Sequence, residues 1–174
     1  GGEKWGRYSI IGLPCRRVIR VYGHEVVVEE DGNEVERSVA DDPLAWIEEF
    51  HRGFRVAEPP GLPRFTGGLV GYFGYDTIRY IEPRVAHCPN RDELGTPDIL
   101  LMLSEEVVVF DNLAGKLFLV VHADPGEEGA LARAEARLDE LEERLAGPLA
   151  RPVSPASVAV SEEDFVSGFT QEGF

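Results

Sequence analysis

The chain has 174 residues, of which 43% are hydrophobic, which is enough to bury the core of one domain or of one domain and part of another. Its 17 lysines and arginines face 32 aspartates and glutamates, so the formal net charge is −15. That charge repels phosphate backbones and argues against binding to nucleic acid or to an anionic membrane. No apolar run approaches the roughly 18 residues that a membrane-spanning helix requires.

An antiparallel meander is predicted for the first part of the chain. Alternating and β-branched stretches indicate four strands, at residues 7–11, 17–22, 25–30 and 34–39. Gly23-His24 and Asp31-Gly32 are turn signals of the kind that joins neighbouring strands. Strands joined by such short turns pair antiparallel.

A helix is predicted directly after the meander. Asp42 suits the N-cap, Pro43 suits the first helical position, and Gly53 can end the helix. One apolar stripe is formed by Leu44, Ile47 and Phe50. The following residues 56–64 contain three prolines and are expected to form a loop.

A glycine-rich stretch begins at Gly67. Its first half is expected to be a buried strand, and residues 75–82, which lack glycine and proline, are expected to turn helical. Glycines recur every three residues, at Gly68, Gly71 and Gly74. This spacing matches neither of the phosphate-binding patterns GxGxxG and GxxxxGK[ST], so the favoured role is close packing of another backbone or a helix against the strand.

Three further strands and a long helix are predicted in the second half. The strands are expected at residues 99–103, 107–111 and 116–122. The helix is expected to be capped by Asp124, with Pro125 in its first turn and Glu127 at the capping-box position. Its apolar stripe comprises Leu131, Ala134, Leu138, Leu141 and Leu145.

The predicted fold class is α+β, with mainly antiparallel strands in two packed, β-sandwich-like sheets and flanking helices. Strands in runs joined by short turns favour this arrangement over a parallel sheet with crossover helices. Residues 150–159 hold two prolines and two serines and are expected to be a linker.

No complete catalytic or metal site is predicted in this sequence. The four histidines share no ligand spacing, and no Gly-x-Ser-x-Gly elbow is present. Asp111 ends a predicted strand, where turn capping is the favoured role and a general base the alternative. The two cysteines, Cys15 and Cys88, cannot form a disulfide scaffold, so a reducing cytoplasm is the expected location.

Three stretches together resemble the large subunit of anthranilate synthase, component I, among the chorismate-utilising enzymes. They are residues 5–12 (WGRYSIIG), residues 67–82 (GGLVGYFGYDTIRYIE) and residues 97–111, which begin Pro-Asp and end VVVFD. Residues 165–174 (FVSGFTQEGF) are similar to the entry of that family into its second domain. The resemblance covers essentially the whole chain in order.

The resemblance implies that residues 1–149 form the N-terminal, feedback-regulatory domain. Residues 150–174 would be a linker and the start of the chorismate-utilising catalytic domain. Both ends look cut, so the chain is expected to be a piece of a longer protein and to be inactive alone.

The resemblance also implies the chemistry of the whole enzyme. It would convert chorismate and ammonia to anthranilate and pyruvate, a lyase reaction of L-tryptophan biosynthesis. Mg²⁺ would be bound by the C-terminal domain, and a glutamine amidotransferase subunit, component II, would deliver the ammonia. The alternatives are component I of aminodeoxychorismate synthase, from the folate pathway, and a non-catalytic effector-binding or subunit-docking module.

The candidate tryptophan site is the strand of Arg7, Tyr8 and Ser9. The family's LLES segment, whose Glu and Ser touch the inhibitor, would lie just before Gly1. Arg7 would pair with a carboxylate, Ser9 would offer a hydroxyl and Tyr8 a ring face. Alternation along a strand, however, predicts Tyr8 on the face opposite Arg7 and Ser9.

Overall fold

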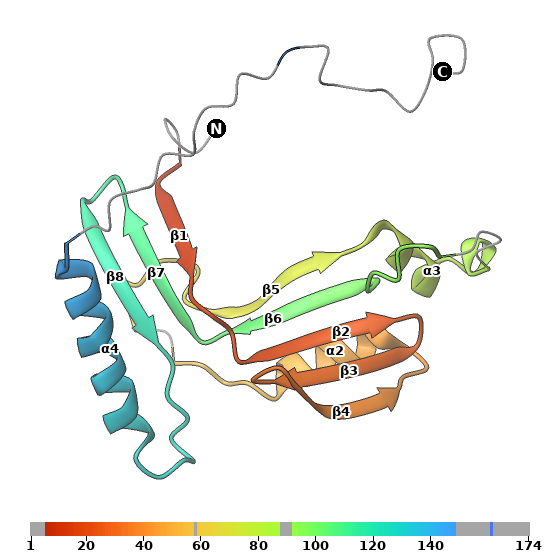
Figure 1. Ribbon diagram of the computed structural model, residues 1–174, viewed down its shortest axis with the longest axis horizontal. Helices are drawn as coiled ribbons and strands as arrows, with labels where there is room; N and C mark the ends of the chain where they lie inside the picture. Colours follow the sequence, from red (N-terminus) through yellow and green to blue (C-terminus); the bar gives the residue numbers. More distant parts are fainter. Residues whose placement is uncertain (1–5, 58, 88–91, 149–160, 162–174) are drawn as a thin grey trace.

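The computed structural model describes residues 6–57, 59–87, 92–148 and 161, and this part of the chain folds into two antiparallel sheets with helices (Figure 1). The strands are β1 (Tyr8–Gly12), β2 (Arg17–Tyr22), β3 (Glu25–Glu30), β4 (Asn33–Val39), β5 (Gly68–Phe73), β6 (Ile99–Ser104), β7 (Glu106–Asp111) and β8 (Lys116–Val121). The α-helices are α2 (Pro43–Arg52), α3 (Ile78–Ile81) and α4 (Ala130–Ala146), and short 3₁₀ turns cover Tyr75–Thr77 and Pro83–Val85.

The chain passes from one sheet into the other at a corner, once between β1 and β2 and once between β6 and β7. The three-stranded sheet has the order β1-β7-β8, and the five-stranded sheet has the order β4-β3-β2-β6-β5. Only Glu105 separates β6 from β7, and only residues 13–16 separate β1 from β2. The sheets therefore meet at this corner, and β1 and β5 border the same open side (Figure 1). The expected α+β class, with two antiparallel sheets and flanking helices, is confirmed.

The main core lies between the five-stranded sheet and α2. Its buried side chains are Ile19, Val21, Val26, Val28, Ile47, Ile99 and Leu101. The start of α2 is set by the predicted N-cap, because Asp42 Oδ1 accepts hydrogen bonds from the backbone N–H groups of Leu44 (3.0 Å) and Ala45 (3.2 Å). The helix thereby begins where it can insert Ile47 into the core.

The predicted hairpins β2–β3 and β3–β4 of the meander are confirmed, but the strand predicted at residues 7–11 is not part of the meander, because β1 pairs with β7 in the other sheet. β3 begins after the Gly23-His24 turn and ends at Glu30 as expected. Asp31 and Gly32 have φ angles of 51° and 79°, as the favoured two-residue hairpin turn requires. Local turn chemistry thus defines the register of these hairpins next to their turns, and a bulge between Val28 and Glu29 shifts the β3–β4 pairing further along.

The glycine-rich stretch forms a strand as predicted, but the prediction that this strand is buried is wrong. β5 pairs with β6 alone and is an edge strand of the five-stranded sheet, and four of its six residues are exposed. A glycine-rich apolar run has the same appearance in a central strand and at an edge, so position in the sheet cannot be inferred from it. The predicted helical turn after it is confirmed by the 3₁₀ turn and α3.

The predicted close approach at the strand glycines is confirmed at Gly71. A Cβ there would lie 2.8 Å from the Leu100 carbonyl carbon and 2.9 Å from Leu101 Cα, and closer still to the Leu100 oxygen. A carbon–carbon contact is normally about 3.5–4.0 Å. Any side chain at Gly71 would therefore push β5 away from β6.

The predicted start of the long helix is wrong. α4 begins at Ala130, and the residue before it, Gly129, has a φ of 72° and offers no side-chain cap. Asp124 instead accepts a hydrogen bond from the Gly126 backbone N–H at 2.8 Å and closes a local turn. The Asp-Pro-Gly sequence favours such a turn over a helix start.

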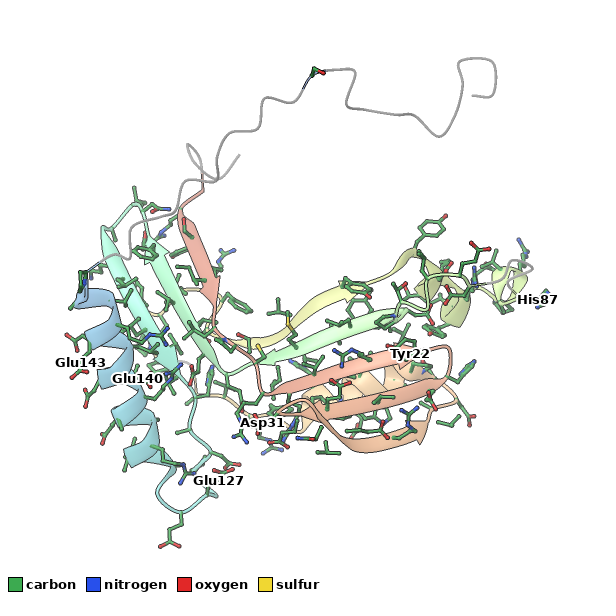
Figure 2. The ribbon with its side chains drawn as sticks, in the orientation of Figure 1. Tyr22, Asp31, His87, Glu127, Glu140 and Glu143 are labelled. Carbon is green, nitrogen blue, oxygen red and sulfur yellow. The ribbon has the colours of Figure 1, made fainter. Side chains whose placement is uncertain are left out.

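The apolar stripe of α4 is narrower than predicted. Ala134 and Leu141 are buried, as is Ala130, whereas Leu131 and Leu145 are largely exposed. The helix contacts β8 and carries exposed acidic side chains such as Glu140 and Glu143 (Figure 2).

The predicted linker and second-domain start, residues 150–174, lie outside the described residues apart from Ser161. Within the described residues, no helix is long and apolar enough to cross a lipid bilayer.

Candidate functional site

The candidate tryptophan-binding residues lie where the first strand of the three-stranded sheet begins. Tyr8 of β1 is paired with Asp111 at the end of β7. The Arg7 guanidinium donates from Nε to Asp111 Oδ1 (3.1 Å) and from Nη2 to Oδ2 (2.8 Å). This two-pronged ion pair joins residues 104 positions apart and anchors the N-terminal end of β1.

Asp111 is a structural group and not a proton-transfer base. Its carboxylate also accepts from the backbone N–H groups of Leu113 and Ala114, each at 3.1 Å, so the predicted turn-capping role is confirmed. Hydrogen bonds from Arg7, with these backbone donors, hold the pKa of Asp111 down at about 2. The buried carboxylate is therefore ionised near neutral pH and already satisfied by its partners.

The predicted orientation of Arg7, Tyr8 and Ser9 needs one correction. Arg7 lies with Tyr8, not with Ser9, because its guanidinium carbon is 4.8 Å from the Tyr8 ring centroid. Ser9 Oγ instead accepts a hydrogen bond from the Asn112 side chain at 3.1 Å. Arg7 precedes β1, so the alternation of a strand does not govern it, and its long side chain folds back to reach Asp111.

The trio therefore presents two separate groups. Arg7 and Tyr8 form a cation–aromatic pair on one side of β1, and the Arg7 side chain remains 52% exposed. Within the described residues, the hydrogen bonds of the Arg7 guanidinium run from Nε and Nη2 to Asp111.

A second polar cluster, around Tyr80, was not predicted from the sequence. The Tyr80 hydroxyl lies 2.9 Å from Asp98 Oδ2 and 2.7 Å from the Gly23 carbonyl, and can donate to either. The Gly23 backbone N–H donates to the same Asp98 oxygen at 2.7 Å. Burial, together with the Asp98 carboxylate, raises the pKa of Tyr80. The cluster ties α3 to the β2–β3 turn, and its only sequence signal is the position of Tyr80 inside the family-like RYIE stretch.

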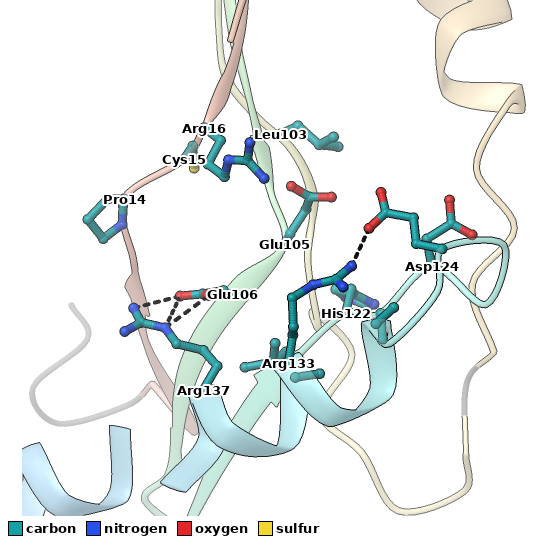
Figure 3. Close-up of a pocket in the computed structure, with 15 residues that line it drawn as sticks. Pro14, Cys15, Arg16, Leu103, Glu105, Glu106, His122, Asp124, Arg133 and Arg137 are labelled. Carbon is teal, nitrogen blue, oxygen red and sulfur yellow. Dashed lines mark hydrogen bonds and ion pairs between the residues drawn. The ribbon is translucent and has the colours of Figure 1, made fainter. Parts of the chain in front are cut away.

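A pocket of about 340 Å³ lies between α4 and the corner of the two sheets (Figure 3). Arg137 pairs with Glu106 at 2.9 Å, and Arg133 pairs with Glu127 at 2.6 Å. Burial raises the pKa of the Cys15 thiol at its wall, which opposes the reactive thiolate form. Arg133 and Arg137 at this pocket are therefore already paired with carboxylates, and the Cys15 thiol is not activated.

Metal ligands do not converge in the part of the chain that the structure describes. No group of three or more His, Cys, Asp or Glu side chains there is placed to hold a metal ion.

Comparison with known proteins identifies the family. The family model described as chorismate binding enzyme matches residues 5–172. The chain belongs to this family. The match spans both sheets, all the helices of the described part and most of the residues beyond α4.

The most similar relatives considered carry one name. Over the whole of this chain, proteins named anthranilate synthase component 1 are 58% identical in Pseudomonas aeruginosa, 53% identical in Pseudomonas putida and 47% identical in a serogroup C strain of Neisseria meningitidis. The chain spans 36% of the length of the two Pseudomonas relatives and 35% of the Neisseria relative.

The fold agrees with a solved relative. The crystal structure of anthranilate synthase component I from Streptococcus pneumoniae TIGR4 matches with a TM-score of 0.61 and 27% sequence identity. That match covers 82% of this chain and 30% of the other. The resemblance drawn from the sequence motifs is therefore confirmed.

Proposed function

We propose that this chain is the N-terminal, feedback-regulatory part of anthranilate synthase component I. The whole protein would convert chorismate and ammonia to anthranilate and pyruvate in L-tryptophan biosynthesis, in the cytoplasm. A glutamine amidotransferase subunit would supply the ammonia. Residues 1–149 would form the N-terminal domain, and residues 150–174 would lead into the catalytic domain.

One observation carries the proposal. The chain aligns over its whole length, at 58% and 53% identity, with two relatives named anthranilate synthase component 1. The polar clusters described above are consistent with a supporting role. The Arg7–Asp111 pair joins the start of β1 to the end of β7, and the Tyr80–Asp98 hydrogen bond joins α3 to the residue before β6.

Mg²⁺ would be bound by the C-terminal domain, outside this chain. The described residues do not fit a Mg²⁺ site, because no set of carboxylates gathers there. The contribution of this chain is therefore proposed to be structural and regulatory, and the fragment alone is expected to have no activity.

The test is product analysis with the full-length protein. Incubated with chorismate, ammonia and Mg²⁺, it is expected to form anthranilate, which is detected by its fluorescence. Accumulation of 4-amino-4-deoxychorismate without anthranilate would overturn the proposal in favour of aminodeoxychorismate synthase. Anthranilate formation by residues 1–174 alone would show that the active site has been misplaced.

For feedback inhibition, we propose that the Arg7–Tyr8 pair contributes to an L-tryptophan site. Arg7 Nη1 would meet the carboxylate and the Tyr8 face would lie against the indole, whereas Ser9, on the other side of β1, would not contact the same ligand. Arg7→Ala and Tyr8→Ala are each expected to raise the tryptophan concentration needed for half-inhibition. If both folded variants keep the parental inhibition curve, the inhibitor is held elsewhere.

A further inference from the structure

The pocket between α4 and the corner of the two sheets has a volume of about 340 Å³ (Figure 3). Its walls come from segments that are far apart in the sequence: the linker between β1 and β2, the β6–β7 corner, the end of β8 with the residues that follow it, and α4. A volume of this size is at the lower end of the range of sites that hold small molecules.

Part of the pocket wall is apolar and held in place by the packing of α4 on β8. Leu103 of β6 is 5% exposed, and Ala130 and Ala134 of α4 are each 8% exposed. Further apolar atoms come from Pro14 and Val121. Such a wall can accept the hydrocarbon part of a ligand, because removing apolar surface from water is favourable.

Negative charges outnumber positive charges around the pocket. Four carboxylates line it against three arginines, namely Glu105, Glu106, Asp124 and Glu127 against Arg16, Arg133 and Arg137. The arginines are paired as follows: Arg137 with Glu106 and Glu140, Arg133 with Glu127, and Arg16 with Asp31 and Glu30. The three guanidinium groups are therefore engaged by carboxylates other than Glu105 and Asp124.

Glu105 and Asp124 thus carry the excess negative charge. Burial raises the pKa of the Cys15 thiol, and the charges of Glu105 and Glu106 raise it further, so the Glu105 carboxylate acts on the pocket wall. Asp124 accepts a hydrogen bond from the Gly126 backbone N–H, which does not cancel its charge. Together with the net charge of −15, this favours a positively charged ligand.

The chemistry of the pocket fits an organic cation better than a metal ion. In the described part of the chain, no three His, Cys, Asp or Glu side chains are grouped closely enough to hold a metal. Zinc and calcium sites need about four to eight ligands around one point. An ammonium group needs fewer partners, since a single carboxylate already gives it a charge-assisted hydrogen bond.

We propose that this pocket binds a small amphipathic organic cation, in which an ammonium group is attached to a short hydrocarbon chain. The ammonium group meets the Glu105 carboxylate, and Asp124 adds its charge nearby. The hydrocarbon part lies against Leu103, Ala130 and Ala134. Because the walls belong to α4 and to the corner, the bound cation joins the helix to the two sheets. This inference does not depend on the proposed function.

Cys15 supplies a direct measure of occupancy, because it lines the pocket. A bound ligand covers the thiol and slows its alkylation by iodoacetamide, which mass spectrometry of the Cys15 peptide follows in the native full-length protein. The probes are hexylammonium, neutral 1-hexanol and anionic hexanoate, compared at one pH and one ionic strength. These probes share a hydrocarbon chain and differ in the charge of the polar end.

Hexylammonium is expected to slow the alkylation of Cys15, with half-protection at a concentration on the order of 1 mM. At ten times that concentration the rate should fall about tenfold. The same concentrations of 1-hexanol and hexanoate should change the rate by less than about twofold. Isothermal titration calorimetry measures the affinity for hexylammonium independently of the thiol.

Glu105→Gln removes the charge and keeps the size of the side chain. It is expected to raise the hexylammonium concentration needed for half-protection about tenfold. Glu135→Gln is the matched control, because Glu135 is an exposed residue of α4 outside the pocket lining, and it should leave that concentration unchanged. Each variant is compared with its own rate without ligand, because Glu105 also affects the pKa of the Cys15 thiol.

Four results would overturn the proposal. Equal protection by 1-hexanol would show that the pocket selects hydrocarbon and not charge. Stronger protection by hexanoate would assign the pocket to anions. Neither protection nor binding heat with hexylammonium at about 10 mM would show that no such site exists. Finally, an unchanged half-protection concentration in folded Glu105→Gln would remove Glu105 from recognition of the cation.

Discussion

Replacing Gly71 with alanine tests the close approach of β5 to β6. The new Cβ would lie 2.8 Å from the Leu100 carbonyl carbon and 2.9 Å from Leu101 Cα. Normal contact between carbon atoms begins near 3.5 Å, so the strands would have to separate by at least about 0.7 Å, and by more to clear the still closer Leu100 oxygen, or the backbone would have to twist. The atoms that would be struck belong to backbone and cannot rotate away.

The expected cost is roughly 2–4 kcal/mol in the free energy of unfolding, from overpacking together with weakened ladder hydrogen bonds between β5 and β6. Gly12→Ala is the matched control, since Gly12 also lies in an edge strand but has no atom within 4 Å of its added Cβ. Urea unfolding, followed by the fluorescence of Trp46 in α2, measures both variants. The reasoning is refuted if Gly71→Ala unfolds within about 0.5 kcal/mol of Gly12→Ala.

Three further predictions concern the polar contacts. At pH values above about 3.9, the ordinary pKa of an aspartate, the ionised Asp111 contributes its full stabilisation to the fold. This contribution should disappear as the pH falls from about 4 to about 2, the pKa of Asp111 in the folded protein. The variant Asp111→Asn should lose that part of the pH dependence of the free energy of unfolding. Asp42→Ala should lower the free energy of unfolding by about 1 kcal/mol through loss of the α2 N-cap, whereas Asp41→Ala should change it little. Tyr80→Phe should cost about 1 kcal/mol by removing the hydroxyl that bonds Asp98. Tyr75→Phe, at a residue that is 93% exposed, is its control, and equal stabilities of the two would contradict the role of the cluster.

The family assignment could be made from the sequence because its motifs are local strings of residues. The WGRYSIIG and GGLVGYFGYD stretches were sufficient to suggest the family, and the match over residues 5–172 agrees. The contacts within the candidate site could be predicted only in part from the sequence. Asp111 was identified as a turn cap, but its partner Arg7 lies 104 positions away, and such pairing has no signature in the chain.

Errors in the predicted elements arose where two local signals competed or where the decisive contact was distant. Asp124 resembles a helix cap, yet the following Pro125-Gly126 closes a turn and α4 starts at Ala130. The glycine-rich strand has the apolar composition of a buried strand, yet it pairs with β6 alone.

The sequence by itself determined the strands of the meander, the α2 cap and the class of the fold, because hairpin turns, caps and alternation act over a few residues. Only the tertiary structure decided which strands became edges, how β6 and β7 turn the corner between the sheets, and which apolar side chains remain exposed. Burial depends on what packs against a side chain, and for Val70 and Met102 the neighbours come from strands far away in the chain.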